Sequence, residues 1–161
     1  MLYKYKASIT GNKIFMREYE ALSDTTLYAF HLFLQNDLGF APDQLVLFRG
    51  IKDSGAIKSQ YGLFDLGDGS MDSVKLSDLI KRGETILHYV YDIRNNRHLI
   101  LDFLSKDEEI YRGSFPRMTL ERGKNPEQFS DRYDDFESLS DLPDSGEIFD
   151  TEELPEGEEG L

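Results

Sequence analysis

Three histidines, His31, His88 and His98, are the side chains of this 161-residue chain whose chemistry fits acid–base catalysis or metal binding near neutral pH. Asp92 and Asp102 lie close to the second and third histidines in the sequence and could add carboxylate ligands to an ion such as zinc. The arrangement of the strands around them decides whether these groups can meet.

His88 and His98 flank a predicted β-hairpin, with strands over 86–93 and 98–104 joined by a tight turn at Asn95-Asn96. Because side chains alternate along a strand, counting outward from that turn puts the two histidines on opposite faces of the sheet. We therefore predict that they do not share a metal ion.

His31 lies on a predicted helix, four residues after Leu27 and four before Gln35, so its ring falls on the apolar face. We expect a buried, neutral, hydrogen-bonded histidine that fixes the helix against a sheet. The alternative is a small-ligand or enzymatic pocket lined by His31, Gln35 and neighbouring tyrosines, in which the ring acts as an acid or base. No G-x-S-x-G nucleophile motif accompanies it, so we assign no catalytic residue.

Three charged residues, Asp92, Arg94 and Arg97, fall at the tip of the same hairpin. The predicted turn places Arg94 opposite Arg97, which is repulsive unless a negative group lies between them. Asp92 falls on the same face, so we expect a salt-bridge cluster; a pair of arginines that binds an anion is the alternative. The candidate binding residues are therefore His31, Gln35, Asp92, Arg94 and Arg97.

The glycine-rich segment Leu66–Ser73 resembles a calcium loop, but its acidic residues do not follow the required spacing. It also lacks the glycine and lysine pattern of a phosphate-binding loop, and no G-x-G-x-x-G motif opens a helix elsewhere. We therefore predict no bound cofactor and no metal.

Alternating apolar and polar residues predict an N-terminal hairpin, with strands over 2–9 and 14–22 around a turn at Gly11-Asn12. Capping residues predict a helix that begins near Thr26 and ends at Gly39. That helix is apolar around most of its circumference, so we expect it to be buried. A short strand is predicted over 44–48, followed by a mobile loop over 49–73 that includes a short strand at 61–65. A short helix through Leu79-Ile80 precedes the hairpin described above. The segment 115–130 is predicted to be irregular, with room for a short helix from Met118. The predicted fold class is α+β, with an N-terminal β-hairpin, one main buried helix, and further strands in a mixed sheet packed on that helix.

The net charge of -13 is concentrated at the C-terminus. Residues 131–161 hold 13 acidic residues against one arginine, whereas residues 1–130 hold 18 acidic against 17 basic residues. We predict a single domain over 1–128 and an acidic, disordered tail over 129–161, because the tail has too few apolar residues to fold alone. This charge distribution disfavours direct nucleic-acid binding, and the tail could instead bind a basic protein partner.

The sequence lacks cysteine, which excludes disulfides and thiolate metal sites. No apolar stretch has the length of a signal peptide core or a membrane span. We therefore expect a cytoplasmic protein with no membrane contact.

Three segments carry a resemblance to a known family: TTLYAFHLFLQNDLGFAPDQLVLF (25–48), VKLSDLIKRGETILHYVYD (74–92) and FPR (115–117). The first resembles the signature T-L-x-x-L-H-x-x-I-Q-x-x-F-G-W-x-x-x-H-L-x-x-F of the family named after the third open reading frame of a root-inducing (Ri) plasmid, also described as an insertion-element passenger. The acidic tail is similar to that of a bacteroidete-type branch of this family.

The resemblance implies an α+β fold, a cytoplasmic bacterial protein and an association with mobile elements, in a family without an established activity. Gln44 stands where the signature has its second histidine, and Arg97 falls where the wider family has a tryptophan loop. The resemblance therefore does not imply a histidine-pair or metal site in this chain.

Together these observations favour a non-enzymatic protein-interaction module whose contact element is the acidic tail or the loop at 50–73. Two alternatives stay open: a small-ligand or enzymatic pocket beside His31 and Gln35, and a mobile-element-associated, nucleic-acid-related protein.

Overall fold

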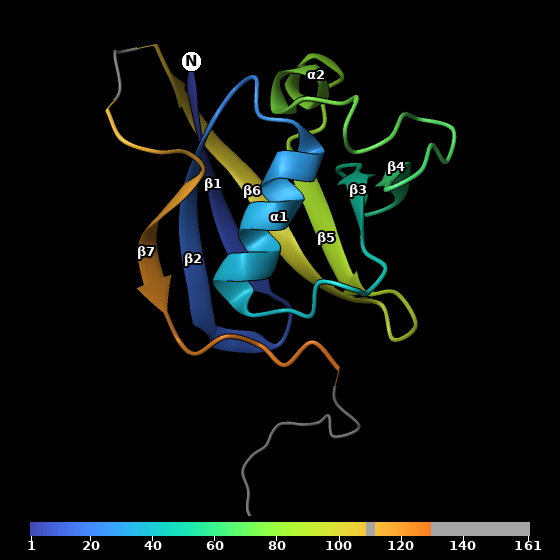
Figure 1. The fold of residues 1–161 in the computed structure, drawn as a ribbon, viewed down its shortest axis with the longest axis vertical. Helices are drawn as coiled ribbons and strands as arrows, with labels where there is room; N and C mark the ends of the chain where they lie inside the picture. Colours follow the sequence, from blue (N-terminus) through green and yellow to red (C-terminus); the bar gives the residue numbers. More distant parts are fainter. Residues whose placement is uncertain (109–111, 130–161) are drawn as a thin grey trace, which may run out of the picture. The chain divides into compact units, whose positions relative to one another are not determined.

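Alternating apolar and polar residues at the start of the chain form two long antiparallel strands, β1 (Leu2–Ile9) and β2 (Asn12–Leu22), which confirms the predicted N-terminal hairpin. The structure, a computed structural model, describes residues 1–108 and 112–129 (Figure 1). The segment Met1–Gln128 forms one compact unit, and Phe129–Leu161 is assigned to another. The disorder predicted for the tail concerns residues that lie outside the described part of the chain, apart from Phe129.

The described strands form one seven-stranded sheet in the order β4-β3-β5-β6-β1-β2-β7, and each neighbouring pair is antiparallel. The remaining strands are β3 (Leu47–Ile51), β4 (Ile57–Gly62), β5 (Ile86–Asp92), β6 (Arg97–Asp107) and β7 (Arg117–Arg122). The prediction of an α+β protein with a mixed sheet packed on one main helix is therefore wrong. The described part of the chain is mostly β, because segments expected to be loops extend the sheet at both ends.

Two short helices accompany the sheet, α1 (Leu27–Leu38) and α2 (Leu76–Lys81). The Thr26 side chain accepts a hydrogen bond from the Ala29 amide at 3.1 Å, and Gly39 ends α1 with the left-handed φ of 72° that glycine tolerates. The bounds predicted for α1 are thus confirmed. Neither described helix has the length and apolar character needed to cross a membrane.

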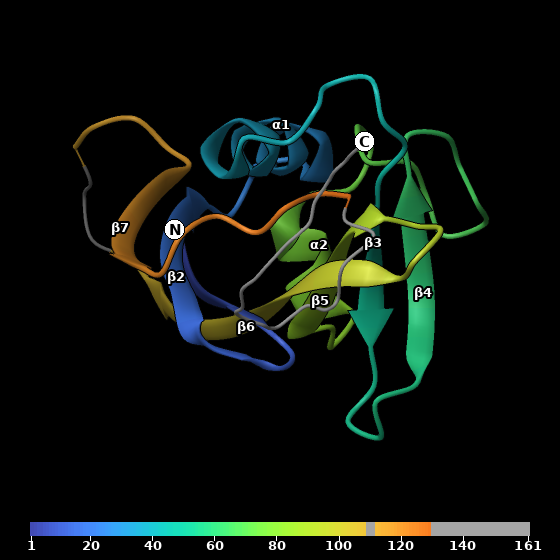
Figure 2. The same cartoon turned by 90° about the horizontal axis from the view of Figure 1, so that it is seen from below.

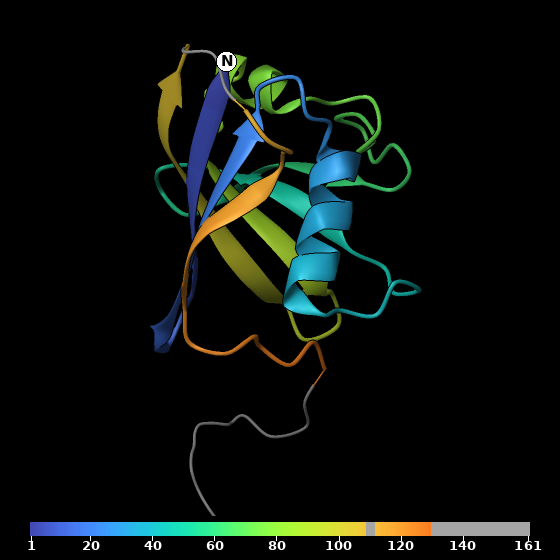
Figure 3. The same cartoon turned by 60° about the vertical axis from the view of Figure 1, so that its left-hand side comes forward.

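Helix α1 lies against one face of the sheet, whereas no described helix covers the opposite face (Figure 3). Helix α2 lies near the upper end of the strands in Figure 1, and in the view from below it lies behind β5 (Figure 2). Aromatic rings fill the space between α1 and the sheet: Phe30 stacks on Phe48 of β3, with ring centroids 6.2 Å apart, and lies edge-on to Tyr19 of β2. We call the uncovered side the open face.

The sequence prediction failed where charged or glycine residues interrupt an apolar pattern. Segment 49–73 contains most of β3 and all of β4, although it was predicted to be a loop with a strand at 61–65. Segment 115–130 contains β7, where a short helix was one expectation. Because β7 is a short edge strand whose residues are exposed or only half-buried, its pattern is weak without knowledge of its partner, β2.

Arg17 of β2 attaches β7 and the segment after it to the sheet. Its side chain is fully buried, and its guanidinium donates to the carbonyl oxygens of Arg122 (2.6 Å) and Gly123 (3.0 Å) and to Oδ1 of Asn125 (2.9 Å). The guanidinium also lies over the ring of Phe15, 4.5 Å from its centroid. A buried charge is tolerated here because several oxygen atoms accept its hydrogen bonds.

The residues after β7 contact the C-terminal ends of both α1 and β5. Asn125 Nδ2 donates to the carbonyl of Asp37 at 3.2 Å, at the end of α1. Gln128 accepts from the amide of Ala41 at 2.8 Å and donates to the carbonyl of Tyr91 at 3.1 Å. This segment therefore joins β7, the end of α1 and the end of β5.

Arg17→Met keeps an unbranched apolar stem but removes the guanidinium and its three bonds to residues 122–125. We expect the free energy of unfolding to fall by about 2–4 kcal/mol, because the oxygen atoms of these residues lose a charged donor. Urea denaturation measures this change, and hydrogen exchange of the β7 amides should rise. Lys13→Met, at the exposed β1–β2 turn, is the control and should change stability by less than about 0.5 kcal/mol; equal stability of the two variants would contradict the role given to Arg17.

Candidate functional site

His31 is buried between α1 and the sheet, with 4% of its surface exposed. Its Nδ1 lies 2.8 Å from the hydroxyl oxygen of Tyr89 on β5. Burial lowers the pKa of His31 and raises the pKa of Tyr89, so both side chains favour their neutral forms. The expected buried, hydrogen-bonded histidine is confirmed.

Gln35 lies one helical turn beyond His31 and is half-buried. Among the described residues, the His31 ring bonds to Tyr89 across the interface and not to Gln35 along the helix. Tyr28 is the other aromatic ring beside His31, with centroids 5.9 Å apart. The role of His31 and Gln35 in ligand binding stays a prediction, and the geometry gives the ring a structural partner.

Asp92 organises the turn of the β5–β6 hairpin. Its carboxylate is 2% exposed and accepts hydrogen bonds from the backbone amide (3.3 Å) and the side-chain amide (2.9 Å) of Asn95. It also pairs with the guanidinium of Arg97 at 3.8 Å. The predicted ion pair between Asp92 and Arg97 is confirmed.

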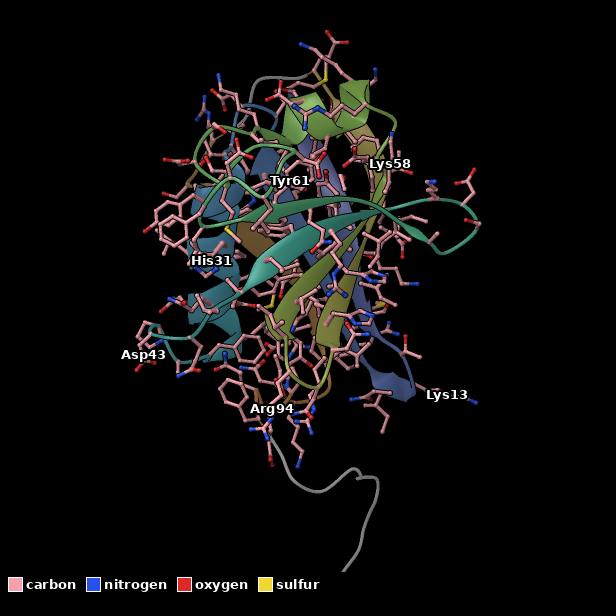
Figure 4. The ribbon with its side chains drawn as sticks, turned by 90° about the vertical axis from the view of Figure 1, so that its right-hand side faces the viewer. Lys13, His31, Asp43, Lys58, Tyr61 and Arg94 are labelled. Carbon is pink, nitrogen blue, oxygen red and sulfur yellow. The ribbon has the colours of Figure 1, made fainter. Side chains whose placement is uncertain are left out.

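The predicted position of Arg94 opposite Arg97 is wrong, because Arg97 pairs with Asp92 across the strands. Arg94 is exposed and lies at the hairpin tip, far from His31 and Tyr61 (Figure 4). The five candidate residues are thus divided into two separate places, His31 with Gln35 on α1 and the three charged residues at the hairpin.

The predicted separation of His88 and His98 on opposite faces is also wrong. An irregularity between Val90 and Asp92 shifts the register, so that His98 pairs with Val90 and His88 with Ile100. Both histidines therefore point to the open face, and their rings stack with centroids 4.0 Å apart and an interplanar angle of 14°. Sequence reasoning missed this pair because it assumed a regular two-residue turn.

Stacked histidine rings do not by themselves form a metal site. Their ring nitrogens lie in nearly parallel planes, so the lone pairs do not converge on one ion. Within residues 1–108 and 112–129, no group of three or more histidine, aspartate or glutamate side chains is arranged to hold a metal ion.

Glu84, a residue that the sequence did not single out, is the centre of a buried polar network. It is 2% exposed, and its Oε1 accepts hydrogen bonds from Ser59 Oγ at 2.8 Å and Tyr61 Oη at 2.7 Å. Lys58 Nζ lies 3.8 Å from Oε2, and Arg82 donates to the Tyr61 hydroxyl at 3.1 Å. No motif could have revealed it, because its partners come from β4 and from the end of α2.

This network joins β4 to the segment just before β5 through hydrogen bonds to Glu84. Gly50 on β3 leaves the room it needs, because a Cβ atom at this position would overlap Glu84 Oε1 and Ser59 Oγ. Ser59 is itself buried, and its hydroxyl already donates to the carboxylate. The arrangement has an acid and hydroxyls but no exposed nucleophile, so it supports packing rather than catalysis.

No family model matches the chain, and no curated protein matches it. Among solved structures it is similar to a protein of unknown function from Methanosarcina mazei Go1, with a TM-score of 0.60 and 21% sequence identity over 77% of this chain and 70% of that chain. A likeness at this identity supports the fold alone. The family resemblance of the sequence therefore stays a prediction.

A double-mutant cycle tests whether the hydrogen bond between His31 and Tyr89 stabilises the fold. His31→Leu and Tyr89→Phe each leave one buried polar atom without its partner, whereas the double variant leaves none. We expect the two losses of stability to be non-additive by about 1 kcal/mol in urea denaturation. Combining His31→Leu with Tyr19→Phe is the control, because the Tyr19 hydroxyl bonds to Asp37; that pair should be additive. Additivity in both pairs would contradict the proposed coupling.

Proposed function

We propose that the chain is a non-enzymatic protein-interaction module whose contact surface is a set of exposed apolar side chains beside α1. We call this set the apolar patch; its members are Tyr28, Leu32, Phe64 and Leu66. Phe64 carries the proposal, because 79% of this large apolar side chain is exposed. Exposed apolar groups that lie together are typical of protein-binding surfaces.

Backbone hydrogen bonds hold the two parts of the apolar patch beside each other. The amide of Tyr28 donates to the carbonyl of Met71 at 3.0 Å, and the amide of Met71 donates to the carbonyl of Gly62 at 2.9 Å. The first turn of α1 is thus fixed next to the end of β4, only two residues before Phe64. Tyr28 and Leu32 share one side of α1, because they are one helical turn apart.

The surroundings of the apolar patch are acidic. Asp65, Asp68 and Asp72 lie on the loop that carries Phe64, and all three are exposed. Their carboxylates accept local hydrogen bonds, such as those from Gly67 and Gln60 to Asp65 and Asp68, but they keep their negative charge toward solvent. The partner that fits this surface is a protein with an apolar contact area surrounded by basic residues. The acidic sequence 131–161 adds charge of the same sign.

The competing proposal, an enzymatic or small-ligand pocket at His31 and Gln35, has less support. His31 is bonded to Tyr89 in the interior, and Asp92 and Glu84 are likewise buried and paired. A catalytic acid or base must instead reach a substrate. Membership of the plasmid-derived family, and with it a link to mobile elements, is compatible with an interaction module and remains part of the proposal.

A photo-crosslinking amino acid at position 64 tests the contact surface. In cells, we expect it to give a discrete adduct, from which the partner is identified and then purified. The same amino acid at position 14 is the control, because Ile14 is exposed to a similar extent (74%) but lies at the β1–β2 turn. An adduct of twice the mass of the chain would instead identify a second copy, and would contradict a basic partner.

Calorimetry with the purified partner then measures the affinity of two matched variants. Phe64→Ser should weaken binding by about tenfold or more, as expected for an exposed aromatic side chain that becomes buried at an interface. Ile14→Ser should leave the affinity unchanged within about twofold. Equal affinity of wild type and Phe64→Ser would contradict the proposed surface.

A further inference from the structure

Three side chains that can carry positive charge lie together on the open face, away from α1. Arg49 of β3 is directly opposite His88 of β5, and His98 of β6 stacks on His88 with ring centroids 4.0 Å apart. All three are half-buried, so they are in contact with both the sheet and the solvent. This cluster is independent of the apolar patch.

Asn96, in the turn of the β5–β6 hairpin, fixes two of these side chains. Its Oδ1 accepts a hydrogen bond from Arg49 Nη1 at 2.7 Å, and its carbonyl oxygen lies 2.9 Å from His98 Nδ1. Asn96 has a left-handed backbone with φ of 54°, which asparagine tolerates better than most residues. If His98 Nδ1 donates to this carbonyl, its Nε2 remains for another partner.

A guanidinium beside two imidazoles that have no paired carboxylate indicates a place for an anion. On the strands beside the cluster, the direct neighbours are uncharged: Gln60 pairs with Arg49, Ile100 with His88, and Val90 with His98.

Two carboxylates lie near the cluster. Asp92 pairs with Arg97, and Asp102 of β6 lies opposite Lys6 of β1 in the register of the strands. Lys58 of β4 pairs with Glu84 beside the buried network. Among the described residues, no carboxylate is paired with Arg49, His88 or His98.

The electrostatics of His88 agree with this geometry. Burial, followed by the positive charges of His98 and Arg49, lowers the pKa of His88 to about 4. His88 therefore resists protonation as long as the site is empty of anions.

We propose that Arg49, His88 and His98 form a binding site for a phosphate-type oxyanion on the open face. The guanidinium of Arg49 can donate more than one hydrogen bond to phosphate oxygens, and each imidazole can donate one from a ring nitrogen. Two sources share this chemistry, a free phosphate or small phosphate ester and the backbone of a single-stranded nucleic acid. The small ligand is favoured, because the charge of residues 1–130 is nearly balanced and the following sequence is acidic.

Anion binding at this site is linked to proton uptake. The bound negative charge favours the protonated form of His88 and raises its pKa from the low value of the empty site, so the complex binds more protons than the free protein. The affinity for sulfate, an oxyanion of the same shape whose charge does not change in this range, should therefore increase as the pH falls from 7.5 to 5.5.

Titration of the full chain with inorganic phosphate at pH 7.5, and with sulfate at pH 5.5 and pH 7.5, at constant ionic strength set by sodium chloride, tests the site. We expect the ¹⁵N resonances of the His88 and His98 rings to shift with saturation, and the affinity for sulfate to be several-fold higher at pH 5.5 than at pH 7.5. Arg49→Gln should weaken binding at least about fivefold, corresponding to the loss of one charged hydrogen bond. Lys6→Gln, an exposed cation on the same face, is the control and should bind like wild type. Unsaturable shifts, or equal binding by Arg49→Gln and Lys6→Gln, would overturn the proposal.

His98→Gln separates the site from a general effect of Arg49 on folding. This variant should keep the thermal midpoint of the wild type within a few degrees but bind phosphate more weakly, because one of the three hydrogen-bond donors is lost.

Fluorescence anisotropy with a labelled twelve-nucleotide oligothymidylate tests the second source of phosphate. Saturable binding of inorganic phosphate without binding of the oligonucleotide supports a small ligand. Oligonucleotide binding that Arg49→Gln abolishes supports the same oxyanion site with a nucleic-acid source, and oligonucleotide binding that Arg49→Gln leaves intact would contradict the site.

Discussion

The packing of α1 on the sheet requires that two polar side chains inside the interface, His31 and Tyr89, satisfy each other. Both side chains lie in an otherwise apolar interface, where an unpaired ring nitrogen or hydroxyl would cost free energy. The bond allows Tyr89 to pack against Phe48, with ring centroids 5.0 Å apart, and Phe48 in turn stacks on Phe30 of the helix. Aromatic packing thus holds α1 on the sheet, and one hydrogen bond satisfies the polar atoms that this interface buries.

This arrangement gives the sheet two different faces. The covered face is filled by aromatic rings, with Arg17 and Glu84 as buried charges that are paired at its two ends. The open face carries Arg49, His88 and His98, which are half-buried and in contact with solvent. Because the reactive groups of the interior are bonded to each other, the groups available to other molecules are on the surface. The apolar patch and the oxyanion site lie on different parts of that surface and can act independently.

Local patterns in the sequence were sufficient for the elements that lie next to each other along the chain. Alternation gave β1, β2 and the β5–β6 hairpin, and Thr26 and Gly39 set the two ends of α1. The ends of the sheet could not be predicted in this way. β7 is recognisable only from its pairing with β2 and from the contacts of Arg17, which join residues more than a hundred positions apart.

Local sequence patterns also predicted only part of the candidate site. His31 could be recognised as buried from its place on the apolar side of a helix. Asp92 could be recognised as an ion-pair partner at the hairpin from its distance to the turn. His88 and His98 could not be placed, because one irregularity near Tyr91 changes which face each side chain takes. Glu84 has partners on β4 that no short motif connects to it. In each case the missing information was the pairing of distant strands.

The ¹⁵N chemical shifts of the His31 ring, followed from pH 5 to pH 8, measure most directly whether this side chain is committed to the fold. A histidine held inside the interface by Tyr89 keeps a neutral ring with one nitrogen protonated, and its shifts stay constant over this range. A ring that titrates with a pKa near 6.5 and exchanges freely with water would contradict this role, and would place an accessible acid–base group on α1.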